Sequence, residues 1–314
     1  MANLTPVIPD VLIRVDTLFI RPRHCGVYIL RGGPHAVLIE AGSTVSVPPI
    51  LAALDELGIE RDDVTHLFIT HAHLDHSGGA GLLLQALPRC VVVCHPSALP
   101  HIVDPFDKLV PAAVGVYGED VFQRDYPGIL CSPKDRVVAA ENDSMHGPDK
   151  AELQLRCLHS HGHAYHHAFY YSEKYRLLFG GDGLGFTFDE LGGCPLLCTS
   201  PSQYDGKAWR GSLEIARTLD VELLLVTHFD VCPRSQLPKR WASIAKQLDD
   251  YDRIVETANS REEVESMYKE VIRIHLADYG QDNPNVLTTA WLYIIGDVNV
   301  DGLWYRVQRR LAKK

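Results

Sequence analysis

The chain has 314 residues, 46% of them hydrophobic and 22% charged, which is typical of a globular protein with room for one large domain and an appendage. Its formal net charge of -10 argues against a broad phosphate-binding surface and hence against a nucleic-acid partner. Residues 1–10 lack a basic start, and no stretch reaches the roughly 20 apolar residues that cross a membrane. We therefore expect a cytoplasmic protein without a signal peptide or a membrane partner.

Eight cysteines are scattered along the chain without a C-x-x-C pair. Cys90 and Cys94, like Cys194 and Cys198, are four apart, which is not a usual metal-finger or redox spacing. We expect all eight to be reduced thiols, mostly buried, in a reducing compartment.

The N-terminal part alternates between strand formers and helix formers. Strands are predicted over residues 11–19, 25–30 and 35–39, with a Gly-Gly-Pro turn at 32–34. A helix over 47–57, a strand over 64–69, a helix over 79–87 and a buried strand over 89–94 follow. This alternation indicates an α/β fold.

A dense set of metal donors follows the strand at 64–69. The stretch H-x-H-x-D-H places three imidazoles and a carboxylate within six positions: His71, His73, Asp75 and His76. His71 and His73 are two apart, so an extended segment would put both on one side. Asp75 and His76 are adjacent and cannot join that cluster in extended geometry, so we expect them to serve a second metal as the chain turns into a helix.

Residues 96–127 lose the regular alternation. Apolar residues there have no clean period, and three prolines interrupt any long helix. We predict a helical insertion, in which Phe106 and Tyr117 either line a pocket or pack the insertion on the core.

Further donors lie at the ends of later strands. A strand over 152–157 leads to His159, His161 and His163, and a hairpin over 167–179 leads to Asp182. A strand that begins at Val221 ends in His228, after a helix over 205–219. Because α/β folds place their sites at the carboxyl ends of strands, we expect these donors to meet, with residues 183–202 as a loop beside them.

The last 80 or so residues are helical by the same criteria. Helices are predicted over 241–254 and 261–276, the second with Ser260 as N-cap, and apolar segments cover 287–295 and 303–311. These residues could cover the active site, pair with another subunit as a homodimer, or support the core, and we expect a contribution to both a lid and a dimer surface.

The chain resembles the metallo-β-lactamase fold superfamily through five motifs in order, over residues 10–232. They are an acidic residue after a strand (Glu40), the H-x-H-x-D-H stretch, a Gly-His pair (His163), a Gly-Asp pair (Asp182) and a strand-end histidine (His228). The resemblance implies a four-layer αββα fold over 1–232, with the helical insertion at 96–127 and a C-terminal helical extension over 233–314.

The resemblance also implies the ligands of a binuclear metal centre. His71, His73 and His163 would hold one ion, Asp75, His76 and His228 the other, and Asp182 would bridge them. Two positions depart from the family pattern: Glu40 stands where Asp is usual, and His161 where hydrolases often have Pro. We assign His163 rather than His161 as the ligand because a glycine precedes it, and we place His159 on the surface and His167 behind the ligands.

In such a centre two divalent ions would share a water molecule and lower the pKa of that water to give hydroxide. Zinc is the ion expected first, with iron or manganese as alternatives. The predicted function is hydrolysis of an ester, thioester, lactone or phosphodiester in a small-molecule substrate. Asp75 and Asp182 would act in catalysis, and Tyr165 would either donate to a substrate oxygen or pack the strand. The alternative is a diiron redox or oxygen-binding protein of the same fold.

Overall fold

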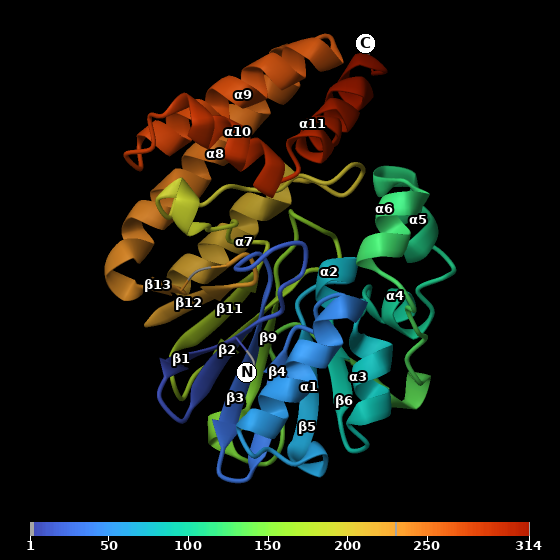
Figure 1. Cartoon of the computed structure of the whole chain (residues 1–314). Coiled ribbons are helices and arrows are strands. Elements are labelled where there is room, and N and C mark those ends of the chain that lie inside the picture. The colour runs from blue at the N-terminus through green and yellow to red at the C-terminus, as the bar shows by residue number, and fades with distance from the viewer. Residues whose placement is uncertain (1–2, 230, 314) are drawn as a thin grey trace. The chain divides into compact units, whose positions relative to one another are not determined.

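The computed structural model describes residues 3–229 and 231–313, and its contacts divide the chain into two compact units (Figure 1). Unit 1 comprises the N-terminal residues through His159 together with His166–Gly181. Unit 2 comprises Ser160–Tyr165 and the residues from Asp182 onward. The domain boundary expected at residue 232 stays a prediction.

Unit 1 holds a seven-stranded sheet whose strands run in sequence order: β1 (Leu4–Ile8), β2 (Leu12–Asp16), β3 (Gly26–Gly32), β4 (His35–Ile39), β5 (Val64–Ile69), β6 (Val91–Cys94) and β7 (Val137–Ala139). Neighbours are antiparallel up to β4, and the pairs from β4 to β7 are parallel. β4 and β6 are apolar and mostly buried. Because the strands from β4 to β7 are parallel, their carboxyl ends lie along one edge. This edge carries the first donors.

Helices cover one face of this sheet because their apolar stripes face it. Ile50 and Leu54 of α1 (Val47–Glu56) and Leu83 of α3 (Ala80–Ala86) are buried in one core with Leu38 and Leu67 of the sheet. Proline within the first turn of α1 suits a helix start, where its missing N–H costs no hydrogen bond. The predicted helix at 47–57 is thus confirmed.

Unit 1 also holds four antiparallel strands of a second sheet: β8 (Ser144–His146), β9 (Leu155–His159), β10 (Ala168–Ser172) and β11 (Leu177–Gly181). Tyr170 of β10 joins the two sheets, because its hydroxyl donates to the carbonyls of Ile69 (3.1 Å) and Val93 (3.0 Å). The turn expected around residues 142–144 is shorter than predicted, since Ser144 already begins β8.

The segment between β6 and β7 is helical, which confirms the predicted insertion. It contains α4 (Leu99–Val103), α5 (Leu109–Tyr117) and α6 (Glu119–Asp125). Phe106 is 51% exposed, whereas Tyr117 is half-buried with its ring 6.4 Å from that of Tyr126.

Unit 2 consists of α7 (Gly206–Thr218), the antiparallel pair β12 (Leu223–Val226) and β13 (Val231–Pro233), and four helices: α8 (Leu237–Thr257), α9 (Arg261–Ala277), α10 (Pro284–Tyr293) and α11 (Gly296–Leu311). Ser260 caps α9 as predicted, with its side chain accepting from the Glu263 amide. Trp209, Tyr251 and Leu303 are fully buried in this unit. The helices of the extension therefore share a core with α7.

Short elements complete the chain: the one-turn helix α2 (Leu74–Ser77) and the 3-10 turns η1 (Thr44–Ser46), η2 (Arg61–Asp63), η3 (Lys134–Arg136), η4 (Ala151–Leu153), η5 (Asp189–Leu191) and η6 (Arg234–Gln236). All eight cysteines are free thiols and most are buried, as expected; Cys131 is exposed. Among the described residues, no helix combines the length and the apolar character that a membrane span requires.

Candidate metal centre

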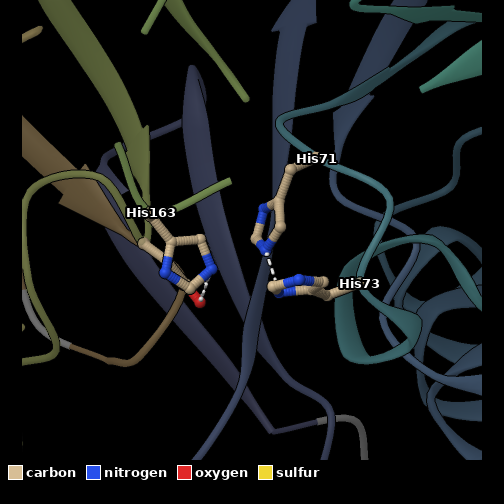
Figure 2. A group of neighbouring side chains, drawn as sticks. His71, His73 and His163 are labelled. Carbon is tan, nitrogen blue, oxygen red and sulfur yellow. Dashed lines mark hydrogen bonds and ion pairs between the residues drawn. The ribbon is translucent and has the colours of Figure 1, made fainter. Parts of the chain in front are cut away.

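In unit 1, the H-x-H stretch leaves the carboxyl end of β5 as an irregular extended segment. His71 is fully buried and His73 is half-buried, and His71 Nε2 lies 2.9 Å from His73 Nδ1 (Figure 2). The segment does what its spacing predicts, because residues two apart in extended backbone point to the same side. The two imidazoles thus present their nitrogens to a common point.

Glu40 orients the histidines of unit 1. Its carboxylate is 1% exposed and accepts hydrogen bonds from Thr70 Oγ1 (2.6 Å), the Thr70 amide (3.2 Å) and His76 Nδ1 (3.0 Å). Thr70 Oγ1, whose proton goes to Glu40, in turn accepts from His71 Nδ1 at 3.1 Å. Both imidazoles are therefore protonated on Nδ1 and keep the Nε2 lone pair for a metal.

Asp75 and His76 lie in the single turn of α2, as the sequence predicts. His76 is fully buried, and its Nε2 lies 3.6 Å from Asp75 Oδ2. The Asp75 carboxyl remains 24% exposed, so this donor is at the open side of the group. The Cys25 thiol contacts the Asp75 carbonyl at 3.4 Å and fixes the loop before β3 to this turn.

Two hydrogen bonds, which we call the clamp, hold the backbone between the candidate ligands His71 and His73. The Ala72 amide donates to His166 Nδ1 at 3.2 Å, and the Ala72 carbonyl accepts from Ser77 Oγ at 3.0 Å. His166 is 1% exposed and its ring lies 5.7 Å from that of His73. Because its Nδ1 accepts a proton, His166 is a support and not a ligand in this arrangement.

His167 lies behind His71, as expected. It is fully buried with its ring centroid 5.0 Å from that of His71. A Cβ at Gly181, which has a φ of +47°, would lie 2.7 Å from His167 Nε2. Glycine at the end of β11 is therefore required by close packing against this histidine.

In unit 2, Gly162 and His163 form the predicted Gly-His motif. Gly162 has a φ of +136°, and a Cβ there would lie 2.4 Å from Trp209, so the position accepts only glycine. His163 is 1% exposed, and its Nδ1 donates to the Cys198 carbonyl at 2.8 Å. With the proton on Nδ1, the lone pair of Nε2 is the one that could bind a metal.

Asp182 faces two different histidines with its two carboxylate oxygens. Oδ2 lies 3.4 Å from His163 Nε2, and Oδ1 lies 3.6 Å from His228 Nε2. All three side chains are nearly fully buried. This is the arrangement expected of a carboxylate that bridges two ions.

The loop that follows Asp182 packs beside His228, as predicted. The Phe186 ring lies 4.3 Å from the His228 ring, and Phe188 lies 6.5 Å from it. The amide of Thr187 also donates to the His228 carbonyl. The loop therefore covers one side of this histidine with aromatic surface.

Other candidates from the sequence lie outside these groups. His161 is exposed, whereas His163 is buried, which supports the choice of His163. His159 is half-buried rather than on the surface, and its Nε2 donates to the Ala140 carbonyl at 2.9 Å. Tyr165 is 49% exposed, and its catalytic role stays a prediction.

The sequence reasoning missed two supporting groups. His166 could have been found from its place beside His167, but its contact with the Ala72 amide depends on tertiary structure. The Cys198 carbonyl has no side-chain signal at all, because any residue offers the same acceptor.

The donor atoms within each unit suit divalent metal ions. Two ligands at the usual bond lengths to a tetrahedral ion are about 3.4 Å apart, close to the 3.4 and 3.6 Å separations around Asp182 and the 3.6 Å between Asp75 and His76. Imidazole and carboxylate donors fit zinc, iron or manganese alike, so the chemistry of the donors does not select one metal.

A family model described as the metallo-beta-lactamase superfamily matches residues 20–228 of the chain. Among curated proteins, the metallo-beta-lactamase fold-containing protein ST1585 of Sulfurisphaera tokodaii is 27% identical over 197 residues, which are 62% of this chain and 68% of that protein. The family match spans all seven donors from His71 to His228.

Three solved structures show the same fold at low identity. An archaeal metallo-beta-lactamase superfamily protein, ST1585 from Sulfolobus tokodaii, has a TM-score of 0.64 at 22% identity, covering 93% of this chain and 98% of that one. The chemotaxis sensor ODP, described with a peroxy diiron species, has a TM-score of 0.55 at 16% identity, and the match covers 76% of this chain and 91% of that one. A B3 metallo-beta-lactamase with an active-site glutamic acid has a TM-score of 0.52 at 16% identity, and the match covers 76% of this chain and 85% of that one.

Proposed function

This chain belongs to the metallo-β-lactamase superfamily and has its fold of two mixed sheets flanked by helices, with a C-terminal helical extension; from that premise we propose that it is a binuclear metal-dependent hydrolase. The substrate would be a small molecule with an ester, thioester, lactone or phosphodiester bond. The observation that supports this most directly is Asp182, whose two oxygens face the ligand nitrogens of His163 and His228.

The family's ligand pattern supplies the proposed metal ligands. By that pattern His71, His73 and His163 would hold one ion, Asp75, His76 and His228 would hold the other, and Asp182 would bridge them. When bound, two such ions lower the pKa of a shared water and polarise the oxygen of the bond to be cleaved. Zinc is the ion we propose first, because it favours both imidazole and carboxylate and has no redox chemistry.

The protein's own groups fix the protonation and orientation of the ligands. Glu40 keeps the His76 proton on Nδ1, and the Cys198 carbonyl does the same for His163. Removing such a partner lowers metal affinity or activity by about 10- to 100-fold in comparable sites. We propose Tyr165, two residues after His163 and half exposed, as the hydrogen-bond donor to a substrate oxygen.

The second candidate function is diiron redox or oxygen binding. Its support is the fold likeness to the chemotaxis sensor ODP, whose structure is described with a peroxy diiron species. Donors limited to imidazole and carboxylate would accept two irons. The two functions differ in the metals that sustain them and in their use of oxygen.

The test is to strip the protein of metal, reload it separately with zinc and with iron, and assay chromogenic esters and phosphodiesters beside oxygen uptake. A hydrolase should cleave with zinc, manganese or cobalt to different degrees and consume no oxygen. Asp182→Ala should lose at least one ion and nearly all turnover, whereas the exposed Asp189→Ala should behave as wild type. Oxygen uptake by the iron form alone, without cleavage under any metal, would favour the redox function instead.

A further inference from the structure

Unit 2 contains a cavity of about 360 Å³, a volume in the range of pockets that hold small organic ligands. It is lined by Thr187 and two glycines of the loop after Asp182, by residues that lead from β13 into α8, and by Tyr279 just after α9. None of the seven candidate metal donors lines it. The cavity is therefore a candidate site of its own.

The wall of this cavity carries two cations and no acid. One of them is Lys239, whose ammonium lies 3.8 Å from the centre of the Tyr279 ring and 3.3 Å from the Asp278 carbonyl. The Asp278 carboxylate pairs with Lys246 instead, at 2.7 Å. The ring and the carbonyl hold the ammonium in place without cancelling its charge, so Lys239 can attract an anion into the cavity.

Arg240 is the second cation, and it is 3% exposed. Its Nε and Nη2 donate to the Leu184 carbonyl at 3.0 and 2.7 Å, and Nη2 also donates to the Gly185 carbonyl at 2.9 Å. These hydrogen bonds fix the guanidinium against the loop after Asp182. A wall that is held in this way needs little reorganisation when a ligand binds.

Thr187 supplies the observation that points to a ligand. It is 4% exposed, and its Oγ1 has no hydrogen-bond partner among the described residues. An unpaired buried hydroxyl is unfavourable, and buried polar side chains nearly always have a partner. The Thr187 backbone is fixed, because its amide donates to the His228 carbonyl and its carbonyl accepts from the Phe229 amide. The hydroxyl is therefore held at the cavity wall with a proton to donate.

The start of α8 adds a further feature that favours an anion. Ser235 and Gln236 line the cavity directly before this helix, and Gln236 at the N-cap makes no capping hydrogen bond with its side chain. The aligned peptide dipoles of a long helix give its N-terminus a partial positive charge, and phosphate groups bind at such ends. The helix start, the ammonium and the hydroxyl thus favour the same kind of ligand.

We propose that this cavity binds the phosphoryl group of a small phosphorylated molecule, with Thr187 and Lys239 donating to its oxygens and the Tyr279 ring beside the rest of the ligand. A phosphoryl group suits the donors better than a carboxylate, because it offers three strong acceptor oxygens. The acidic chain argues only against a broad phosphate-binding surface, and a single cavity is compatible with it. The site goes beyond the proposed hydrolase function and does not depend on it, since none of its residues is a candidate metal ligand.

The test is calorimetric binding of phenylphosphonate, which resists hydrolysis, to the full chain with and without zinc. The metal-free protein should bind it, and benzoate should bind more weakly. Lys239→Gln and Thr187→Val should each weaken binding about tenfold or more, since each removes a hydrogen bond to a charged group. Lys207→Gln is the matched control and should bind as the wild type does, because Lys207 is an exposed lysine of α7 that does not line the cavity.

Thermal unfolding separates loss of the site from damage to the fold. Thr187→Val keeps the shape of the side chain and removes a hydroxyl without a partner, so it should unfold at the same or a higher temperature than the wild type. A clear fall would mean that the hydroxyl already has a structural partner, which contradicts the proposal.

Three binding results would also overturn the proposal: equal affinity in the wild type and both cavity variants, binding that requires zinc, or equal affinity for benzoate. Binding that requires zinc would place the anion on the metals instead of in the cavity. Because metal-free binding involves no turnover, its absence beside normal ester cleavage would count against this site alone.

Discussion

At the scale of single residues, burial and hydrogen bonding predict which histidine of the His159–His163 run binds metal. His163 is buried and its Nδ1 donates a hydrogen bond to the Cys198 carbonyl, whereas His161 is exposed. His163→Ala should therefore lose at least one ion and most activity, and His161→Ala should keep both ions. Metal content measured by atomic emission on dialysed protein checks this, and the reverse result would shift the ligand by two positions.

His166 tests whether support of the backbone matters to the centre. His166→Ala removes the acceptor of the buried Ala72 amide, a loss that costs about 1–3 kcal/mol where no water replaces it. Since Ala72 lies between two ligands, we expect metal affinity to fall about tenfold. His166→Asn, which offers another acceptor, should restore part of the affinity in a chelator competition. An alanine variant with wild-type affinity would mean that the clamp has no influence on the ligands.

The sequence indicates candidate ligands more readily than it indicates the groups that support them. The H-x-H-x-D-H motif is easy to recognise, because so many metal-binding side chains close together at a strand end are rare by chance. It contains His71, His73, Asp75 and His76. The clamp at Ala72 depends on a contact between residues 94 positions apart, which no local pattern contains. Supports of this kind become visible only when the chain is folded.

At the level of elements, long buried strands and helices were predicted, and the short strands β8 and β13 were not. β4 has the bounds that its apolar run indicates, and the helix predicted at 205–219 corresponds to α7. β8 and β13 have three residues each, too few for a period to show. The apolar segment predicted over 303–311 is the end of a longer helix, because α11 already begins at Gly296.

The C-terminal helices hold the loop that orients His163, which gives this extension a testable role. Asn299 of α11 accepts from the Thr199 amide at 2.5 Å, and Gln247 of α8 accepts from the Leu197 amide at 3.1 Å. Cys198 lies between these anchors and offers its carbonyl to His163. The extension therefore supports the position of His163 through the loop.

Asn299→Leu should therefore weaken metal binding as well as the fold. It leaves the buried Thr199 amide without its acceptor, which costs about 1–3 kcal/mol, and frees the loop around Cys198. We expect metal affinity to fall about 10-fold or more. Thermal unfolding and chelator competition measure the two effects, with the exposed Asn285→Ala as control. A lower unfolding temperature with unchanged affinity of the folded protein would separate the extension from the centre.

At the scale of the whole molecule, the extension should be inseparable from unit 2. A chain ended at Arg234 would uncover Trp209 and Tyr204, which are almost fully buried, and would remove the Gly302 site where the Thr199 backbone packs closely. Exposed apolar surface of this extent promotes association. We expect the truncated chain to aggregate, whereas a chain ended at Leu311 should remain intact.

Leu292 separates a core role of the extension from a dimer role. Leu292 is 71% exposed on α10. Leu292→Ser should therefore change the free energy of unfolding by no more than about 0.5 kcal/mol. If α10 pairs two copies, as we propose, sedimentation should show a weaker dimer in this variant and full metal content. A wild-type protein that is monomeric at all concentrations would refute the dimer, and a soluble, active chain ended at Arg234 would refute the core role, because each measurement reports on one role alone.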